Sequence, residues 1–143
     1  MILVDVNILI NAVHTGSPHH VGVKAWLDAA ILQGIELGFP WLVLVGFVRI
    51  TTNPKITRQP FTLEDAFSQI DAWLALPNAR MVNPTLQHLR HFEDQCRRAN
   101  ATANLVTDAH LAALAVEHQC ELASTDGDFA KFANVKWVNP LVP

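Results

Sequence analysis

Short apolar runs alternate along this chain with longer stretches that mix apolar and polar residues, which is typical of strands alternating with helices. Four runs predict strands covered on both faces, at residues 1–4, 35–39, 79–82 and 121–124. Residues 136–138 are a candidate for an additional edge strand. Because helices connect these strands, the pattern predicts an α/β fold, a parallel sheet with helices on both faces.

The helices are marked mainly by the residues at their ends. Ser17 and Gly34 are a start and a stop signal for a helix over residues 18–33. Residues 41–52 have the length and apolar density of a buried helix, although their β-branched side chains also fit a strand. Thr62 predicts the start of a helix that ends near residue 76. Further helices are expected at residues 5–13, 85–98 and 105–118.

Composition narrows the class of protein. A chain of 143 residues fits one domain, residues 1–143, and its 50% hydrophobic content excludes a disordered chain and favours an oligomer. Its apolar runs are shorter than the ~20 residues of a membrane span, and its start has no basic region of a signal peptide, so we expect no membrane association and a cytoplasmic location. The net charge of −3 gives no general attraction to nucleic acid.

Acidic residues recur where predicted strands end or a predicted helix begins. Asp5 follows the first strand, Asp108 opens the helix at 105–118, and Asp126 and Asp128 follow the fourth strand. Ligands bind at this edge of open parallel sheets, so the four carboxylates are expected in one pocket. Two such charges ~4 Å apart repel by roughly 4 kcal/mol at an effective dielectric constant of about 20. The cluster must therefore take up protons or a cation, and an all-oxygen site suits Mg²⁺ or Mn²⁺.

Each acid also has a purely structural interpretation. Asp5 fits a helix cap, Asp108 is favoured by the dipole of the helix it opens, and Asp126-Gly127-Asp128 is ordinary turn chemistry. The metal-site hypothesis rests on the convergence of three segments at one edge. Because the acids repel each other without metal, removing Asp5 or Asp108 is expected to leave the stability of the metal-free protein unchanged or higher.

Three segments resemble the acidic motifs of PIN-domain ribonucleases, and most closely those of the VapC toxins of bacterial toxin-antitoxin pairs. They are Met-Ile-Leu-Val-Asp-Val-Asn at residues 1–7, Leu-Val-Thr-Asp-Ala-His-Leu-Ala-Ala-Leu-Ala at 105–115 and Thr-Asp-Gly-Asp-Phe at 125–129. The resemblance spans nearly the whole chain, with the motifs in the family's order and spacing. Its most specific piece is Asp-Ala-His-Leu-Ala-Ala-Leu-Ala.

The resemblance implies a three-layer α/β/α PIN-like fold with a short central parallel sheet. It implies Mg²⁺-dependent cleavage of RNA, with Mn²⁺ able to substitute. Carried over residue by residue, it makes Asp5 and Asp108 the principal metal ligands and catalytic acids, Asp126 a further catalytic acid and ligand, and Asp128 an auxiliary ligand. One or two ions would then activate water and stabilise charge on the leaving oxygen.

The resemblance also implies two protein partners, a second copy of the chain in a homodimer and a VapB-type antitoxin. The predicted helices at residues 18–33 and 41–52 are candidates for the antitoxin groove, with Trp26, Trp41 and Phe47 as anchors. The alternative is that these aromatic side chains fill the core. An arginine of the antitoxin could pair with Asp5 or Asp108 and displace the metal ion.

One position departs from the family pattern. The family usually carries glutamate just before a Phe-x-Arg segment, and here the residue is Gly46. A second hypothesis is therefore a catalytically degenerate PIN-like domain that only binds a protein partner. A third is a receiver-type phosphotransfer domain, but Asn83 follows the strand at 79–82, where that class carries its phosphoacceptor aspartate, and Asn7 replaces its second acid near the first strand.

Other polar residues allow a binding or an ordinary role. His88 and His91, three residues apart, could bind a metal, but a solvated helix face is the stronger interpretation. Arg49, Lys55 and Arg58 could contact phosphates, or simply belong to a solvated loop.

Overall fold

The computed structural model describes residues 1–142, and its centre is a five-stranded parallel sheet with strand order β3-β2-β1-β4-β5. The predicted edge strand is present and pairs with β4. Strand pairing confirms the predicted parallel arrangement. The strands are β1 (Ile2–Val4), β2 (Leu37–Pro40), β3 (Ala79–Val82), β4 (Glu121–Ala123) and β5 (Trp137–Val138).

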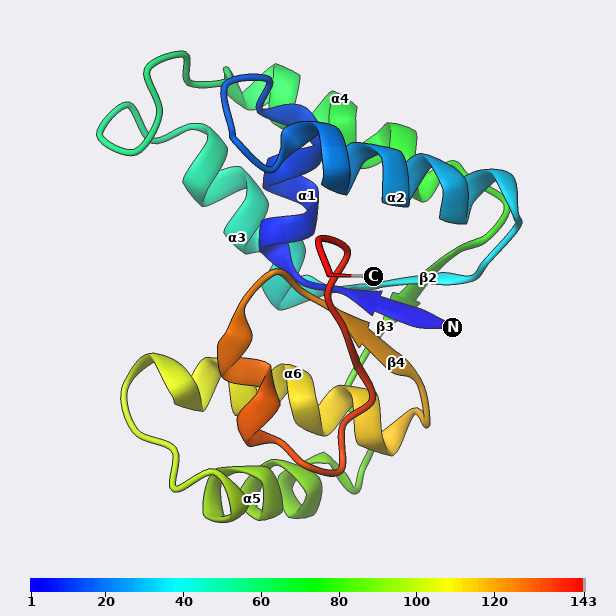
Figure 1. Ribbon diagram of the computed structural model, residues 1–143, viewed down its shortest axis with the longest axis vertical. Helices are drawn as coiled ribbons and strands as arrows, with labels where there is room; N and C mark the ends of the chain where they lie inside the picture. The colour runs from blue at the N-terminus through cyan, green and yellow to red at the C-terminus, as the bar shows by residue number, and fades with distance from the viewer. Residues whose placement is uncertain (143) are drawn as a thin grey trace.

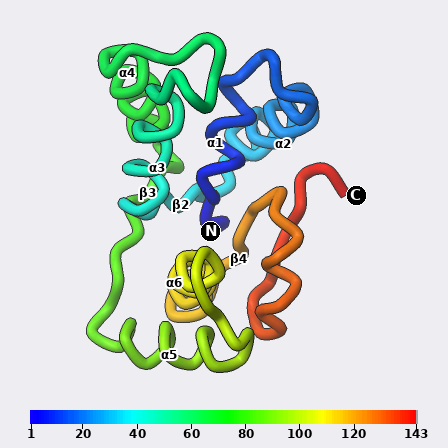
Figure 2. The backbone as a smooth tube through the Cα atoms, turned by 90° about the vertical axis from the view of Figure 1, so that its left-hand side faces the viewer, coloured from blue at the N-terminus to red at the C-terminus, as the bar shows by residue number. Residues whose placement is uncertain are grey.

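The helices lie in two layers, with α1 to α4 on one face of the sheet and α5 and α6 on the other (Figures 1 and 2). The chain runs from β1 to β2 to β3 in one direction and then returns to β4 on the other side of β1. Because parallel crossovers are right-handed, this reversal places the later helices on the opposite face. The helices are α1 (Val6–Val13), α2 (His20–Leu32), α3 (Trp41–Thr51), α4 (Leu63–Leu74), α5 (His88–Arg98) and α6 (Asn104–Glu117), with the 3₁₀ helix η1 (Gly127–Lys131) after β4.

The two central strands are buried on both faces. Leu3 of β1 is aligned with Gly38 of β2 and Leu122 of β4, and Leu3 and Leu122 are wholly buried. This two-sided burial explains why these strands are continuous apolar runs in the sequence. Their rigid, dry packing fixes the positions of the residues that follow them.

Two predicted helix ends are confirmed in atomic detail. Thr62 caps α4 through a reciprocal pair of hydrogen bonds with Asp65, each between a side chain and a backbone N–H. Gly34 adopts a φ of 69° just after α2, a left-handed conformation that glycine adopts without steric cost.

The predicted starts of α2 and α5 are too early. The Ser17 hydroxyl accepts a hydrogen bond from the His19 N–H, which forms a local turn, and α2 begins at His20. Thr85 likewise accepts from the Gln87 N–H while its hydroxyl donates to a carboxylate of α6. Serine and threonine side chains bond to nearby backbone and so compete with the first helical turn.

Helix α3 is buried on one side only. Phe47 is wholly buried, with its ring edge-on to Trp73 at a centroid distance of 5.1 Å, so its predicted role as a partner anchor is wrong. Trp41 and Val45, by contrast, are 61% and 59% exposed.

Within residues 1–142, no helix has the length and hydropathy needed to cross a membrane.

Candidate active site

The candidate site lies where the strand order reverses, at the carboxyl ends of β1 and β4. These strands are direct neighbours, with Val4 aligned with Ala123. Asp5 follows β1 immediately, and Asp126 follows β4 after a two-residue link. The segments that follow two neighbouring strands leave the sheet toward opposite faces and open a crevice between them. Open α/β sheets bind ligands in such a crevice.

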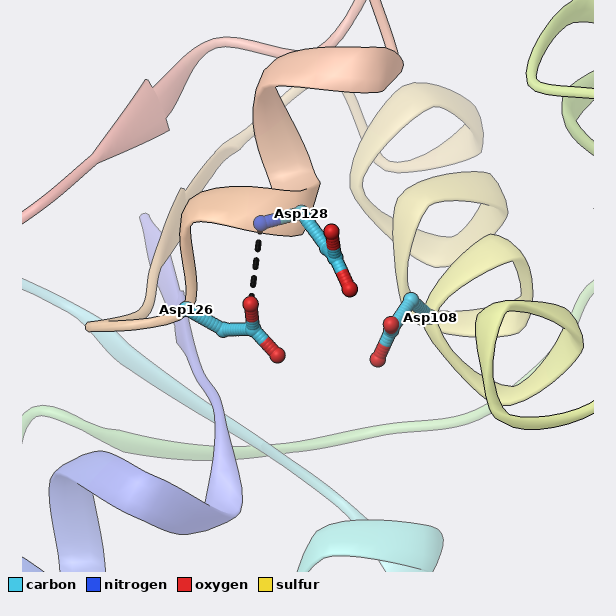
Figure 3. Close-up of side chains that lie close together, drawn as sticks. All are labelled: Asp108, Asp126 and Asp128. Atoms are coloured by element: carbon cyan, nitrogen blue, oxygen red, sulfur yellow. Dashed lines mark hydrogen bonds between the residues drawn. The ribbon is translucent and has the colours of Figure 1, made fainter.

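Helix α6 adds a third acid to this crevice. Asp108 lies in its second turn, half-buried, while Leu111 and Ala112 of the same helix are buried. Carboxylate oxygens of Asp108, Asp126 and Asp128 all lie within 4.8 Å of one another (Figure 3). The backbone N–H of Asp128 also donates to Oδ1 of Asp126 at 2.9 Å, which holds the turn between them. The predicted convergence of α6 and the loop after β4 is therefore confirmed.

Asp5 belongs to the same cleft but not to this tightest group. It lines a hollow of about 240 Å³ together with Asp108 and Asp126. Its side chain is buried and acts as the N-cap of α1, with Oδ1 accepting from the Val6 N–H at 2.6 Å. Asp5 therefore caps a helix, as its structural interpretation predicts, and it also lines the acidic cleft, where the metal-site hypothesis places it.

Asn7 and Ser124 connect the two acidic segments, and the sequence reasoning assigned neither of them a role in the site. Oδ2 of Asp5 accepts from the Asn7 amide at 2.8 Å and from the Ser124 hydroxyl at 2.7 Å. The Asn7 amide also donates to Ser124 Oγ, and Asn7 Oδ1 accepts from the Thr125 N–H. Ser124 Oγ further accepts from the Asp126 N–H at 3.0 Å. Spacing in the sequence could have indicated both residues, because each of them lies two positions from an aspartate of the site.

Burial and mutual repulsion raise the pKa of two of the acids. Desolvation raises the pKa of Asp5, and the charge of Asp126 adds to this, while hydrogen bonds from Ser124, Val6 and Asn7 act in the opposite direction. Desolvation and the charges of Asp126, Asp5 and Asp128 raise the pKa of Asp108 to about 6. Without a cation, Asp108 therefore keeps its proton at pH values well above those at which aspartate normally loses it.

One lysine partly neutralises the exposed side of the cluster. Lys131 of η1 forms an ion pair with Asp128, with Nζ 2.8 Å from Oδ1 and both side chains about half exposed. This hydrogen bond raises the pKa of Lys131, so the lysine stays charged at neutral pH. The pair leaves Asp108 and Asp126 without a cationic partner among residues 1–142.

The donor set fits Mg²⁺ or Mn²⁺. Both ions prefer carboxylate oxygens, and three carboxylates close enough to share one ion converge at the cleft. Within the part of the chain that the structure describes, Asp108, Asp126 and Asp128 form the one group of three or more such residues with this geometry.

Gly46 lines the same cleft, on the side formed by α3. A Cβ atom there would lie 3.3 Å from Cγ2 of Val6, the residue after Asp5. The position at which the family usually carries glutamate therefore faces the site. The absence of a side chain lets α3 approach the first turn of α1 closely.

His88, Arg58 and Trp137 do not line the cleft. His88 is not on a solvated face as predicted, because its ring bridges Glu117 and His110 of α6 at 2.6 and 2.9 Å. Arg58 lines a separate hollow beside His14. Trp137 packs at the sheet edge and donates from Nε1 to the Ser124 carbonyl at 2.9 Å.

An apolar groove adjoins the acidic cleft. It runs between α3 and α4, measures about 570 Å³, and shares Val45 and Arg49 with the cleft. Trp41 and Phe67 line it and are 61% and 53% exposed. Helix α2 packs mainly on α1, so this groove is formed by α3 and α4 and not by the two helices, at residues 18–33 and 41–52, that the sequence suggested for an antitoxin. Trp41, one of the candidate anchors, is exposed in this groove, and its contact with an antitoxin stays a prediction.

We expect Asp5→Ala to destabilise the metal-free protein. The substitution removes the acceptor of the buried Ser124 hydroxyl and one acceptor of the half-buried Asn7 amide, at a cost of about 1–3 kcal/mol. The expectation of a neutral effect, which followed from repulsion alone, therefore does not apply to Asp5. Urea unfolding in EDTA measures the loss, and Asp28→Ala, which removes an exposed acid, is the control. Equal stability of Asp5→Ala and the control would contradict the role of the network.

Asp108→Asn should instead stabilise the metal-free protein at neutral pH. The folded state holds the Asp108 proton to about pH 6, whereas the ordinary pKa is 3.8. Ionisation therefore costs stability as the pH rises through this interval, and the cost is complete above it. Melting temperatures in EDTA should be higher for Asp108→Asn above pH 6 and equal below pH 3.8. A constant difference at every pH would show that the substitution acts through packing.

Comparisons with known proteins agree with this geometry. The family model for the PIN domain matches residues 2–135. Ribonuclease VapC37 of Mycobacterium tuberculosis is 43% identical over 140 residues, which cover 98% of this chain and 97% of that protein. Ribonuclease VapC25 of the same organism is 38% identical, with coverage of 98% and 99%.

Two solved structures share the fold at low sequence identity. FitAcB from Neisseria gonorrhoeae has a TM-score of 0.72 at 21% identity over the full length of both chains. VapBC2 from Rickettsia felis, bound to a DNA fragment from its promoter, has a TM-score of 0.70 at 14% identity, covering 97% of this chain and 98% of that one. The chain belongs to the PIN-domain family, and within it groups with the VapC proteins.

Proposed function

We propose that this protein is a metal-dependent endoribonuclease that acts as the toxin of a type II toxin-antitoxin pair. The observation that carries the proposal is the convergence of Asp108, Asp126 and Asp128 within 4.8 Å at the cleft that Asp5 also lines. The full-length relatives are named ribonucleases, which supports RNA as the substrate. Cleavage of a phosphodiester fits the site, because its chemistry depends mainly on positioning a metal ion and little on a protein nucleophile.

The chain's own residues would prepare the site for this reaction. Asp108, Asp126 and Asp128 would hold Mg²⁺ or Mn²⁺, with Asp5 as a further ligand or catalytic acid at the base of the cleft. When bound, such an ion polarises a phosphodiester and makes water a stronger nucleophile. Asn7 and Ser124 hold the Asp5 carboxylate in one orientation, so its position does not depend on the ion.

Protonation couples metal binding to pH. The pKa of Asp108 is raised to about 6 in the metal-free protein, so below that pH a cation must displace a proton. Metal affinity should therefore fall as the medium becomes more acidic than pH 6. Once bound, the cation would also offset the repulsion among the ionised carboxylates of the cleft.

The degenerate-domain alternative is less well supported. Gly46 supplies no carboxylate, yet the other four acids remain and three of them share one small region. A domain that only bound proteins would gain nothing from gathering repelling carboxylates in one place, with Asp108 half-buried.

Cleavage of RNA should require the divalent ion and the clustered acids. We expect the protein to cleave single-stranded RNA with Mg²⁺ or Mn²⁺ but not in EDTA, and Asp126→Asn to lower the rate by at least ~100-fold. Either ion should also raise the melting temperature, because it binds only the folded state. Asp28→Asn, an exposed acid on α2, is the matched control. An Asp126→Asn variant as active as this control would contradict the proposed site.

We further propose an antitoxin and a second copy of the chain as protein partners. Structural neighbours include a toxin-antitoxin complex from Klebsiella pneumoniae, which supports a partner of the same kind here. Exposed apolar side chains such as Trp41, Val45 and Phe67 favour contact with partner proteins.

We assign the antitoxin segment to the groove between α3 and α4. Because Val45 and Arg49 line both the groove and the acidic cleft, a chain seated in the groove passes directly to the carboxylates. An antitoxin arginine placed there would match the carboxylates and compete with the ion. Binding and inhibition would then be one event.

Phe67→Glu should break this complex without affecting the cleft. A charge in the groove would weaken binding of an apolar segment by at least ~10-fold. Co-purification with the antitoxin measures the effect, and Val21→Glu, a matched change at an exposed apolar residue of α2, should leave the complex intact. Equal antitoxin binding by both variants would show that the partner uses another surface.

A further inference from the structure

Unpaired positive charge is scarce on this protein. Within residues 1–142, six of the chain's ten lysines and arginines form ion pairs with carboxylates. The four that do not are Arg49, Lys55, Arg58 and Arg90. Such residues remain available for an external anion.

Arg49 is the one member of this set that lines the acidic cleft in the part of the chain that the structure describes. It lies in the last turn of α3 with an exposed side chain. Lys55 and Arg58 belong to the segment after α3, and Arg90 lies on α5, on the opposite face of the sheet. A free guanidinium therefore stands at the rim of a cleft whose other charged groups are Asp5, Asp108 and Asp126.

Gly46 helps to keep Arg49 free. Positions three residues apart on a helix are neighbours on its surface, so residue 46 is where an α3 side chain could pair with Arg49. Glycine offers no such partner and leaves the cleft open beside the arginine. The other cation near the acids, Lys131, is already paired with Asp128. Arg49 thus differs from Lys131 in forming no ion pair among residues 1–142, although Asp71 lines the adjoining groove with it.

We propose that Arg49 binds a phosphate of the RNA backbone next to the phosphodiester that is cut, an inference that rests on the proposed ribonuclease function. A guanidinium donates a planar pair of hydrogen bonds that matches phosphate. With a net charge of −3 and four aspartates around the cleft, the protein repels RNA at the place where RNA must enter. One unpaired arginine at the rim supplies the local attraction and fixes the register of the strand.

Substitution of Arg49 should therefore weaken substrate binding more than turnover. We expect Arg49→Ala to raise KM for a short single-stranded RNA by ~10-fold with Mg²⁺, with kcat changed by less than ~3-fold. Arg49→Lys keeps the positive charge but loses the planar pair of donors. Its KM should therefore lie between the KM of the unmodified protein and that of Arg49→Ala. The slope of log affinity against log salt should become shallower by ~0.7, the value for one lost phosphate contact on a single strand.

Arg90→Ala is the matched control, since Arg90 is also exposed and unpaired but lies away from the cleft. RNA affinity is measured in parallel by fluorescence anisotropy with Ca²⁺ in place of Mg²⁺, which tests Arg49 even if no cleavage occurs. Equal RNA affinity, KM and salt slope for Arg49→Ala and Arg90→Ala would overturn the inference. So would a loss confined to kcat, or one confined to antitoxin binding. Failure of the unmodified protein to cut RNA with either ion would instead contradict the proposed function.

Discussion

The repulsion among the acids at the carboxyl edge of the sheet is the constraint on which the rest of the structure depends. Asp5 is buried, Asp108 is half-buried, and their pKa values are raised because water cannot screen them and other carboxylates lie near. Such an arrangement persists only when the surrounding structure holds it rigidly. The dry central strands β1 and β4 and the hydrogen bonds of Asn7 and Ser124 provide that rigidity.

The acids have unequal parts in this arrangement. Asp5 is fixed by three donors and contributes to folding as well as to the cleft. Asp108 and Asp126 have no cationic partner among residues 1–142, and the raised pKa of Asp108 shows that its negative charge is unfavourable there. The site therefore combines one acid that hydrogen bonds hold in place with a group of acids for which we propose a metal ion as ligand. This division follows from burial and hydrogen bonding, and it could not be read from four aspartates in a sequence.

Helix α3 links the chemistry to the partner surface. Its buried side anchors it through Phe47, while its exposed side borders both the acidic cleft and the apolar groove. Gly46 permits its close approach to Val6, and Arg49 stands at the junction of the two hollows. A partner seated in the groove would therefore cover the place where we expect RNA to enter. Substrate binding and inhibition would then compete for one short stretch of helix.

The sequence by itself determined the elements and their order. Apolar runs predicted the strands, capping residues such as Thr62 predicted helix ends, and the acids that follow strands predicted one shared edge. These signals are local. A strand that is buried on both faces appears in the sequence as a short apolar run, and a helix cap appears as a polar residue at the helix start. The start of α2 escaped prediction because the Ser17 side chain forms a turn that competes with the first helical turn.

Only the tertiary structure decided which side chains meet. Asn7 and Ser124 lie 117 positions apart, and only the pairing of β1 with β4 brings them together. The burial of Phe47, the place of the groove and the isolation of Arg49 depend likewise on how α3 packs against α1 and α4. Such contacts join residues that are remote along the chain, so no local pattern of hydrophobicity or capping records them.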